Sequence, residues 1–445
     1  MCSVVGIYGN KNASKLAFYA LFAMQHRGQE AAGISSSNGK NIKTVKDRGL
    51  VTQVFKEEHF NILKGDMAIG HTRYSTAGDD SILDAQPVFA RYGLGEISIV
   101  HNGNLVNAKE LRENLIKIGA IFQSNMDTEI LIHLIAKNYT KPTLKERIVD
   151  AVKKIKGAFS LVILSRTKMF VIRDPFGFRP LSLGRLKSGG YIVASETCAF
   201  ELVGAEFIRD VKPGEMIVFE NDSFSSEMIF EPNYKQCIFE YIYFARPDSD
   251  VFGKNVYSVR KQMGRELAKE MPVDADMVVP VPDSGVAAAL GYSEESKIPF
   301  EMAIMRNHYV GRTFIEPTQE IRDLKVKMKL SPIVKKIKGK KLIVIDDSIV
   351  RGTTSKRIIN MLKQAGAKEV HMRIASPATI GPCYYGVDTP TKEELIASKL
   401  STKEIAKYIG ADSLAYLSIE SIIKAIKDKK ENYCFACFDN NYPIL

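Results

Sequence analysis

Two adjacent carboxylates, Asp346 and Asp347, follow a short apolar run in the second half of the sequence. Residues 342–345 are all apolar and the last three are β-branched, so they predict a strand that is buried on both faces. At the end of such a strand, two carboxylates could accept hydrogen bonds from vicinal sugar hydroxyls or hold Mg²⁺. The small, polar residues 348–354 then lead into a predicted helix, and amides at a helix N-terminus suit a phosphate.

Two other interpretations of these residues remain open. A buried strand can end in an acidic turn that binds nothing, and P-loop enzymes also carry an acidic residue at a strand end. The sequence contains no GxxxxGK(S/T) pattern, which disfavours a P-loop enzyme. A second apolar strand is predicted at 277–281, and the turn after it, with Asp283, Ser284 and Gly285, could also offer amides to an anion. Taken alone, that turn is no different from an ordinary strand-to-helix connection.

A nucleophile is possible at the start of the chain. Removal of Met1 would leave Cys2 with a free α-amine beside its thiol. The amine has an ordinary pKa of about 7.7–8.0 and the thiol one of about 8.5, so the amine could act as a base for the thiol. Taken alone, Cys2 is more typical of a small apolar residue on a first strand, because Val4, Val5 and Ile7 follow.

Four of the six cysteines could form a metal site. Cys434 and Cys437 form a C-x-x-C pattern, and Cys237 and Cys383 lie far from it in the sequence. A zinc site, an iron–sulfur site, a redox pair and unrelated buried thiols all fit this pattern. Disulfides are disfavoured in a cytosolic chain. Cys198 is expected in the core.

The elements that would position these residues differ between the two halves. The first half is mostly alternating apolar residues with turns, whereas the second half repeats an apolar strand followed by a helix. The predicted strands of the first half are 159–164, 169–173 and 191–194, and the predicted helices are 105–118, 128–139, 390–397 and 402–408. A boundary near 233–237 gives domains at 2–235 and 236–445.

Four polar motifs accompany Cys2, and in their order they resemble the class II glutamine amidotransferases, whose nucleophile is an amino-terminal cysteine. The motifs are 25–29 (QHRGQ), 71–76 (HTRYST), 101–103 (HNG) and 125–129 (NMDTE). The resemblance implies that Cys2 attacks the carboxamide of glutamine and releases ammonia through a thioester. The side chain of Asn102 and the backbone N–H of Gly103 would form the oxyanion hole.

The same resemblance assigns residues to glutamine binding. Arg73 would bind the α-carboxylate through two parallel hydrogen bonds, and Asp127 would pair with the α-ammonium. Arg27 belongs to this set and is expected to order the loop near the nucleophile. The three histidines in the motifs are expected to be packing or loop residues, because the mechanism needs no imidazole: His26, His71 and His101.

Residues 341–355 (KLIVIDDSIVRGTTS) closely resemble the phosphoribosyl pyrophosphate (PRPP) motif of type I phosphoribosyltransferases. The resemblance implies one Mg²⁺ per subunit, held by Ser284, Asp346 and Asp347. The residues implied in PRPP binding are Asp283, Ser284, Gly285, Asp346, Asp347, Ser348, Arg351, Gly352, Thr353 and Thr354. Residues 305–330 would form a lid over PRPP, on which Arg312 and either Lys327 or Lys329 could neutralise the charge of the leaving group.

The matches extend over nearly the whole chain and resemble the amidophosphoribosyltransferase family, in its cluster-bearing, Bacillus-like branch. The resemblance implies an α+β, N-terminal nucleophile αββα sandwich followed by an α/β, type I phosphoribosyltransferase Rossmann-like parallel sheet domain. Periodicity alone does not distinguish the sandwich from another α+β arrangement.

The family makes 5-phosphoribosylamine, glutamate and pyrophosphate from glutamine, PRPP and water, the first committed step of purine synthesis. Ammonia would cross a shielded channel between the sites. Purine nucleotides (AMP, GMP and ADP) are implied inhibitors, and the implied assembly is a homotetramer. The branch implies one 4Fe–4S cluster per subunit with a structural role, Zn²⁺ being the runner-up. Its ligands would be Cys237, Cys383, Cys434 and Cys437.

Composition is ordinary for a globular enzyme, with 45% hydrophobic and 25% charged residues in a chain of 445. Residues 1–235 carry 30 Lys and Arg against 25 Asp and Glu, and the remainder carries 32 against 26, so the net charge of +11 is spread evenly. The sequence contains no block of basic residues that would indicate nucleic-acid binding. Residues 1–10 lack the features of a signal peptide and no apolar run reaches membrane-spanning length, so we expect a cytoplasmic protein without a nucleic-acid or membrane partner.

Two rival classes share part of this pattern. Class II amidotransferases that make glucosamine phosphate or asparagine have other synthase domains, without the Asp346–Asp347 motif. A regulator that senses PRPP without catalysis, like some purine repressors, would have no use for Cys2 and its motifs. The sequence also shows no helix-turn-helix pattern for DNA.

Overall fold

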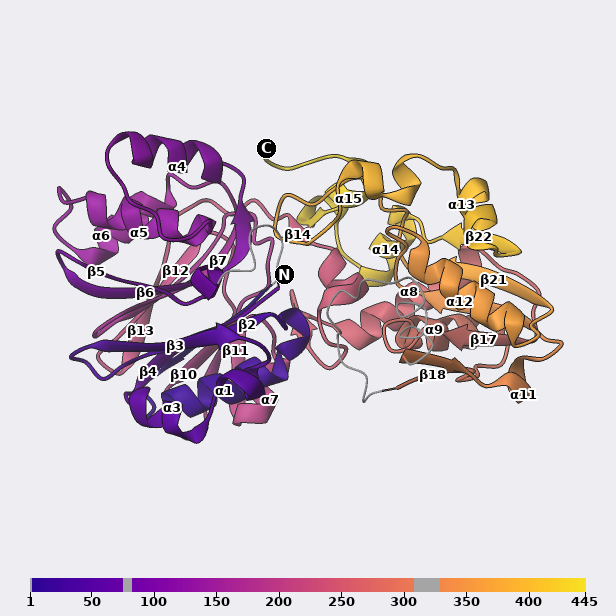
Figure 1. Ribbon diagram of the computed structural model, residues 1–445, viewed down its shortest axis with the longest axis horizontal. Coiled ribbons are helices and arrows are strands. Elements are labelled where there is room, and N and C mark those ends of the chain that lie inside the picture. The colour runs from indigo at the N-terminus through magenta and orange to yellow at the C-terminus, as the bar shows by residue number, and fades with distance from the viewer. Residues whose placement is uncertain (1, 75–81, 308–328) are drawn as a thin grey trace.

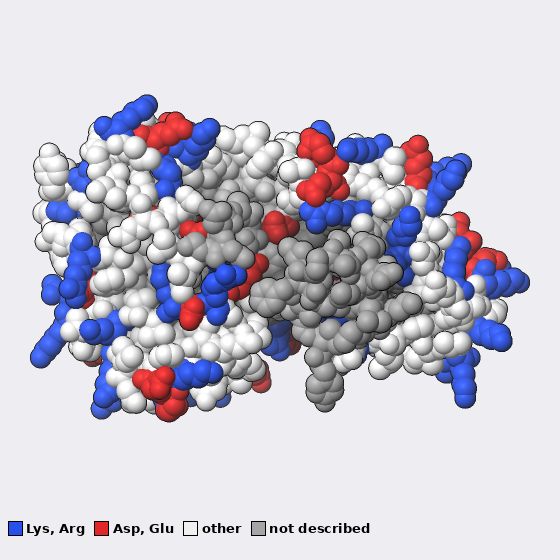
Figure 2. All heavy atoms as spheres, viewed as in Figure 1, with Lys and Arg blue, Asp and Glu red and all other residues white. Residues whose placement is uncertain are grey.

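The computed structural model describes residues 2–74, 82–307 and 329–445. They form two lobes side by side, the first half of the chain in one and the second half in the other (Figure 1). On the face shown in Figure 2, Lys and Arg are scattered over both lobes among acidic residues, and no single basic patch gathers them among the described atoms of that face.

The first lobe contains two stacked antiparallel sheets. Within the described residues, one sheet has the strand order β11-β9-β10-β1-β4-β2-β3 and the other β13-β12-β8-β7-β6-β5. The strands are β1 (Ser3–Tyr8), β2 (Ala31–Ser37), β3 (Ile42–Arg48), β4 (Met67–Arg73), β5 (Val88–Tyr92), β6 (Gly95–Leu105), β7 (Gly157–Ser165), β8 (Met169–Arg173), β9 (Ser182–Leu186), β10 (Tyr191–Ala194), β11 (Ala205–Asp210), β12 (Glu215–Glu220) and β13 (Ser223–Met228). Strands β1, β7 and β8 are buried along their whole length, which explains why their sequences are mainly apolar.

Helices cover the outer faces of both sheets. Apolar side chains of α1 and α7 pack on the first sheet, those of α4, α5 and α6 pack on the second, and a third apolar cluster fills the space between the sheets. The helices and helical turns of this lobe are α1 (Ala13–Ala23), η1 (Gln25–Arg27), α2 (Val51–Val54), α3 (Glu57–Ile62), η2 (Ile82–Asp84), α4 (Ala108–Lys117), α5 (Asp127–Lys137), α6 (Leu144–Val152) and α7 (Cys198–Val203). The predicted αββα sandwich is confirmed.

The second lobe is built on a parallel sheet with the strand order β17-β20-β21-β22. In β20, Ile343 and Ile345 pack against helices on one face, while Leu342 and Val344 pack on the other. Both faces of the strand are therefore buried, as predicted, and the parallel, Rossmann-like arrangement is confirmed. The strands and their main helices are α8 (Val256–Glu270), β17 (Met277–Pro280), α9 (Val286–Ser296), β20 (Lys341–Asp346), α12 (Thr353–Gln364), β21 (Glu369–Ile374), α13 (Thr402–Ile409), β22 (Ser413–Tyr416) and α14 (Ile419–Ile426).

Short elements surround this sheet and the junction of the lobes. Strand β14 pairs in parallel with β23 near the end of the chain, so that Cys237 lies opposite Cys434. The short elements are β14 (Gln236–Cys237), the π-helical turn η3 (Glu240–Phe244), β15 (Asp250–Val251), β16 (Lys254–Asn255), β18 (Ile304–Arg306), β19 (Leu330–Pro332), α11 (Val334–Ile337), η4 (Lys392–Glu394), η5 (Ile396–Ser398), η6 (Lys430–Asn432), β23 (Tyr433–Cys434) and α15 (Ala436–Asp439).

Two local predictions were wrong, and one strand was not predicted. Leu105 ends β6, where it pairs with Gly157, instead of beginning a helix. Residues 390–397 contain 3₁₀ turns and no α-helix, because the backbone N–H of Ile396 bonds to the carbonyl of Val350 instead of continuing a helix. The sequence did not mark β22, since only one of its four residues is buried and it is defined by its pairing with β21. No helix of the described residues is long and apolar enough to span a membrane.

Candidate functional site

Cys2 lies directly before β1 and contacts the strand that carries Asn102. The backbone N–H of Cys2 donates to Oδ1 of Asn102 at 3.3 Å, and its Sγ lies 4.0 Å from the carbonyl oxygen of Tyr74. Asn102 is 1% exposed, and its Nδ2 has no hydrogen-bond partner in the part of the chain that the structure describes. A buried donor without a partner is uncommon. This N–H is therefore available to a group that binds beside Cys2.

Gly103 follows Asn102 on β6, in a position that admits no side chain. Its φ is +153°, and a Cβ there would lie 1.9 Å from the carbonyl oxygen of Ala158 on β7. The close approach of two backbones requires glycine at this point. The HNG motif is thus fixed by strand pairing, with Asn102 placed beside Cys2.

Asp84 lies between Arg73 and the backbone that leads into α5, which Asp127 begins. Nη2 of Arg73 lies 3.6 Å from Oδ2 of Asp84, and Oδ1 of Asp84 accepts the backbone N–H of Asn125 at 3.2 Å. Asp127 begins α5 two residues later. The side chains of Arg73 and Asp127 are 12% and 19% exposed, so both are accessible from a mostly buried setting.

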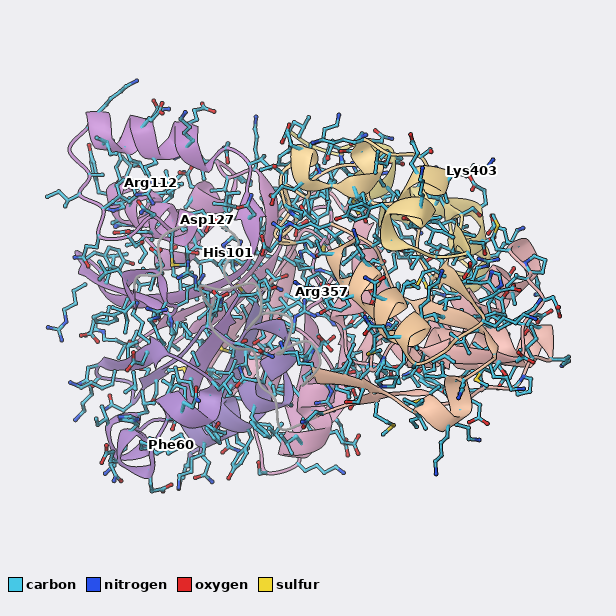
Figure 3. All side chains as sticks on the ribbon, turned by 45° about the vertical axis from the view of Figure 1, so that its right-hand side comes forward. Phe60, His101, Arg112, Asp127, Arg357 and Lys403 are labelled. Atoms are coloured by element: carbon cyan, nitrogen blue, oxygen red, sulfur yellow. The ribbon has the colours of Figure 1, made fainter. Side chains whose placement is uncertain are left out.

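Asp127 also pairs with His101, which lies beside it in Figure 3. Nδ1 of His101 is 3.3 Å from Oδ1 of Asp127, and the backbone N–H of Leu105 donates to Oδ2 at 3.0 Å. Burial alone would raise the pKa of Asp127, but the charge and hydrogen bond of His101 hold it below its ordinary value. The carboxylate is therefore ionised, which is what an ammonium partner needs.

His71 is a packing residue, as predicted. Its Nε2 lies 3.2 Å from the carbonyl oxygen of His101, to which it can donate. Burial lowers the pKa of His71 to about 3, so the ring is neutral near pH 7. It supports the strand that carries Asn102 without contributing charge.

Arg27 lies at the nucleophile but is completely buried. Its Nε donates to the carbonyl oxygen of Cys2 at 3.1 Å, and its Nη atoms bind the carboxylates of Glu196 and Glu240. The prediction that it orders the region around Cys2 agrees with these contacts. Its described partners are protein groups, so direct binding of glutamine remains only a prediction.

The second set of predicted residues meets at the carboxyl ends of β17 and β20. The hydroxyl of Ser284 interacts with both Asp346 and Asp347. Gly285 packs so closely that a Cβ would lie 2.3 Å from the carbonyl oxygen of Ile345. Burial, and then the charge of Asp347, raise the pKa of Asp346 well above its ordinary value. Two buried carboxylates side by side favour binding of a cation.

The loop after these aspartates leads into α12. Gly352 has φ +74° at the start of the helix, and the next two residues, Thr353 and Thr354, are exposed. The hydroxyl of Ser348 donates to Asp347 at 2.5 Å, and Arg351 pairs with Glu394 at 2.8 Å. Asp283 pairs with Arg306 across the loop. The predicted PRPP residues are thus gathered at one edge of the sheet, where exposed hydroxyls and amides could meet phosphates.

Comparison with known proteins identifies both halves. Residues 71–201 match the glutamine amidotransferase domain and residues 257–384 match the phosphoribosyl transferase domain. The chain is 52% identical to amidophosphoribosyltransferase 1, chloroplastic, of Arabidopsis thaliana. That alignment of 447 residues covers 100% of this chain and 78% of the relative. The chain is also 47% identical over 448 residues to the amidophosphoribosyltransferase of Bacillus subtilis, which covers 99% of this chain and 94% of the relative.

The chain belongs to the amidophosphoribosyltransferase family. The solved structure of the Bacillus subtilis glutamine PRPP amidotransferase, complexed with ADP and GMP, is 46% identical, with a TM-score of 0.94 over 100% of this chain and 98% of that one. As a member of the family, the chain is an enzyme of purine biosynthesis that carries out glutamine-dependent amidotransfer to PRPP. Both rival classes are excluded, because each would match only one half.

The four cysteines proposed from the amidophosphoribosyltransferase resemblance come together at the junction of the lobes. They line one small, mainly apolar cavity: Cys237, Cys383, Cys434 and Cys437. Burial raises the pKa of Cys237 to about 11. Among the described residues, no group of three or more His, Cys, Asp or Glu is already arranged as a metal site. Thiolates are the ligands that soft metals prefer, so the residue types, though not their arrangement here, fit such a metal.

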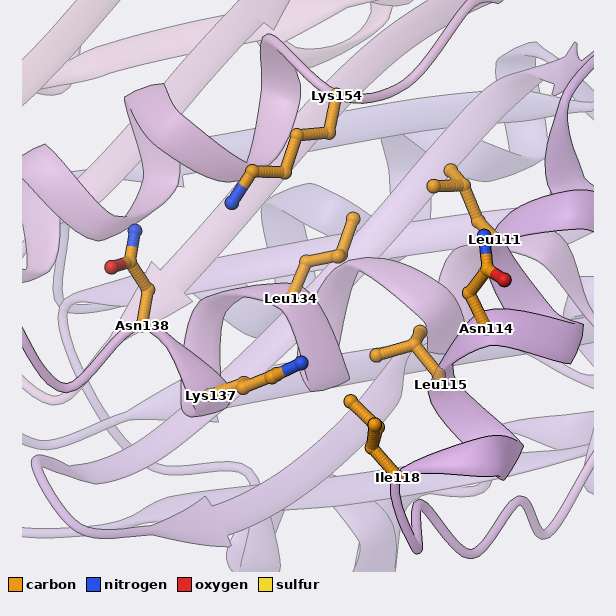
Figure 4. Close-up of a pocket in the computed structure, with 8 residues that line it drawn as sticks. All are labelled: Leu111, Asn114, Leu115, Ile118, Leu134, Lys137, Asn138 and Lys154. Carbon is orange, nitrogen blue, oxygen red and sulfur yellow. The ribbon is translucent and has the colours of Figure 1, made fainter.

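A larger pocket between α4 and α5 is separate from all predicted site residues (Figure 4). It has a volume of about 360 Å³ and is lined by apolar residues, two asparagines and two lysines: Leu111, Asn114, Leu115, Ile118, Leu134, Lys137, Asn138 and Lys154. It contains no nucleophile or carboxylate. The chemistry of the amidophosphoribosyltransferase family therefore lies elsewhere.

Some predictions fall outside the described residues, and some important residues were not predicted. Ser75, Thr76, Arg312 and Lys327 lie outside the described ranges, whereas Lys329 is within them. Glu196 and Glu240, which bind Arg27, belong to none of the sequence motifs. Glu240 had a usable signal, since it is the one charged residue in the apolar run 237–245. Glu196 had none.

Proposed function

We propose that glutamine is hydrolysed at Cys2 and that its ammonia reacts with PRPP beside Asp346 and Asp347. The observation that supports the first site best is the hydrogen bonding of the Asn102 side chain. It binds the backbone of Cys2 through Oδ1 and leaves a buried N–H without a partner among the described residues. An oxyanion forming next to Cys2 would accept that N–H, together with the backbone N–H of Gly103.

The glutaminase step uses the α-amine of Cys2 after removal of whatever precedes it. The amine takes the thiol proton, and the thiolate attacks the carboxamide carbon of glutamine. The tetrahedral intermediate collapses to a thioester and ammonia, the nitrogen leaving with the proton. Water then hydrolyses the thioester to glutamate. Arg73 binds the α-carboxylate of glutamine and Asp127 its α-ammonium.

The transferase step needs ammonia at C1 of the ribose. The nitrogen lone pair forms the new C–N bond, pyrophosphate leaves, and the nitrogen loses a proton. We propose that the PRPP hydroxyls and phosphates bind the Asp346–Thr354 loop, including Ser348, Arg351 and Gly352, and the turn at Asp283, Ser284 and Gly285. The hydroxyl of Ser284 and the two aspartates provide oxygen ligands that fit Mg²⁺, which would neutralise charge on the departing pyrophosphate.

We propose a 4Fe–4S cluster at the four cysteines, with Zn²⁺ as the alternative. Four thiols from β14, β23, α15 and the loop at Cys383 converge on one cavity, and the donor set fits either metal. The cluster would hold the end of the chain against the start of the second lobe. Iron and sulfide analysis of protein purified without oxygen, with a broad absorption near 400 nm, would support it, and stoichiometric zinc would favour the alternative.

We also propose the remaining features that the family implies. The two domains would comprise 2–235 and 236–445. Ammonia would pass between the sites through a shielded route. Purine nucleotides, among them ADP and GMP as in the solved Bacillus subtilis complex, would inhibit at the second lobe. A homotetramer and a cytoplasmic location remain sequence predictions.

The deciding experiment measures both products with the mature enzyme. Edman degradation or mass spectrometry should find Cys2 as the first residue. With PRPP, glutamine and Mg²⁺, glutamate and pyrophosphate should form in equal amounts. With ammonium replacing glutamine, pyrophosphate should still form. Glutamate without pyrophosphate under the first condition would contradict the proposed coupling.

A further inference from the structure

A path of contacts leaves Cys2, crosses into the second lobe and returns to Gly103, the residue after Asn102. It begins at Arg27, whose Nε holds the carbonyl oxygen of Cys2 at 3.1 Å. The two Nη atoms of Arg27 then bind both carboxylate oxygens of Glu240, at 2.9 and 2.8 Å. This is the paired geometry that most strongly fixes a guanidinium. Glu240 belongs to the second lobe, three residues after Cys237.

The return path uses a second arginine. Nη1 of Arg179 lies 3.5 Å from Oε1 of Glu240, and its Nε and Nη2 donate to the carbonyl oxygen of Tyr385 at 3.0 and 2.6 Å. Gly386 follows, with φ +100°, and a Cβ there would lie 2.8 Å from the carbonyl oxygen of Gly103. The backbone next to the proposed oxyanion hole therefore rests on a loop of the second lobe.

The side chains along this path are fully buried and their charges balance. Arg27, Arg179 and Glu240 are 0% exposed. Glu196, also 0% exposed, supplies the second carboxylate, and its other oxygen accepts the backbone N–H of Arg246 at 2.9 Å. Burial would lower the pKa of Arg27, but Glu240 and Glu196 raise it. Removing one carboxylate would leave a buried guanidinium without its counter-charge.

We propose that Glu240 is a positioning residue for glutamine hydrolysis: one carboxylate of the second lobe sets the place of Cys2 through Arg27 and of the Gly103 backbone through Arg179 and the Tyr385–Gly386 loop. The inference rests on the proposed roles of Cys2 and Asn102. With this role for Glu240, the geometry of the glutaminase site depends on contacts between the two lobes. Small displacements of reacting groups reduce rates strongly while substrate binding changes little.

The first test is Glu240→Gln, which keeps the shape and removes the charge. We expect kcat for glutamate release to fall about 30-fold while KM for glutamine changes less than about threefold. The rate with ammonium should stay within about twofold, because it does not use Cys2. A kcat for glutamate release equal to that of the wild type would overturn the proposal.

A second variant decides the matter if Glu240→Gln loses the ammonium-dependent rate as well. Gly386→Ala should push against Gly103 from the second lobe and lower kcat for glutamate release about tenfold. Gly189→Ala is the matched control, since Gly189 has a similar φ of +96° and a Cβ there would meet nothing within 4 Å. Equal effects of the two alanines on kcat would overturn the proposal.

Cys2→Ser separates failure of this inference from failure of the proposed function. If Cys2→Ser still releases glutamate, the nucleophile itself has been assigned wrongly. If Cys2→Ser is inactive and both Glu240→Gln and Gly386→Ala behave like the wild type, only the positioning role is wrong.

Discussion

The two reactive regions are organised by opposite means. Around Cys2, the functional side chains stand on or beside interior strands and are already bonded to one another: Cys2 to Asn102, and His101 to Asp127. Around Asp346, the last residue of β20, they come from the strand end and from the loops beside it, and burial and a neighbouring charge raise the pKa of Asp346. The first region is preorganised by the protein, whereas the second is suited to be completed by a cation and phosphates.

The difference predicts that the two half-reactions can be removed separately. The largest effect should come from Cys2→Ser, because a hydroxyl replaces the attacking thiolate. We expect the glutamine-dependent rate to fall about 10⁴-fold. The ammonium-dependent rate should remain within about twofold. Parallel assays of pyrophosphate with each nitrogen source measure both, and loss of both rates would contradict the separation.

The converse variant is Asp346→Asn, which removes one of the two buried carboxylates. Pyrophosphate release should fall about 10³-fold with either nitrogen source, since the proposed Mg²⁺ loses a charged ligand. Glutamate release without PRPP should persist. Asp274→Asn is the control, because that side chain is 97% exposed in the same lobe. A normal pyrophosphate rate in Asp346→Asn would place the PRPP site elsewhere.

Asn102→Ala tests preorganisation within the first region. Loss of the unpaired N–H should lower kcat for glutamate release about 10²-fold, with a smaller change in KM, because the donor serves the transition state. Steady-state glutaminase kinetics measure the two separately. A rise in KM alone would show that Asn102 binds glutamine instead.

The smallest expected effect comes from His71, which contacts the strand that carries Asn102. His71 has a pKa of about 3 in the folded chain and about 6.5 when unfolded, so the unfolded state binds more protons between these values. The contribution of the neutral, buried His71 to the free energy of unfolding is complete above about pH 6.5. It falls by about 1.4 kcal/mol for each pH unit from about pH 6.5 down to about pH 3. His71→Gln should flatten the decline of unfolding free energy between about pH 6 and 4, measured by urea unfolding.

His59→Gln provides the control for this measurement. His59 lies on α3, a helix with no buried residues. It controls for the effect of replacing a histidine by glutamine on a helix without buried residues. A slope in His71→Gln equal to that of the wild type would mean that His71 is not neutral and buried in the folded protein.

Much of this organisation was predictable from short segments. The apolar run before Asp346 determined a buried strand, and strand–turn–helix geometry determined where its carboxylates lie. The HNG and NMDTE motifs predicted that Asn102 and Asp127 belong to one site, and both residues lie in the first lobe, on β6 and α5. The predictions failed where pairing decides structure, as in β22, whose four residues form a strand only beside β21.

The sequence by itself determined the reactive residue types and the elements that carry them, because those depend on local spacing and periodicity. Only the tertiary structure decided that Glu240 of one lobe would hold Arg27 and Arg179 of the other, and that Gly386 would press on Gly103. Such partners are 61 or more residues apart. A buried charged side chain needs a partner of opposite charge, but the local sequence does not determine which distant residue becomes that partner.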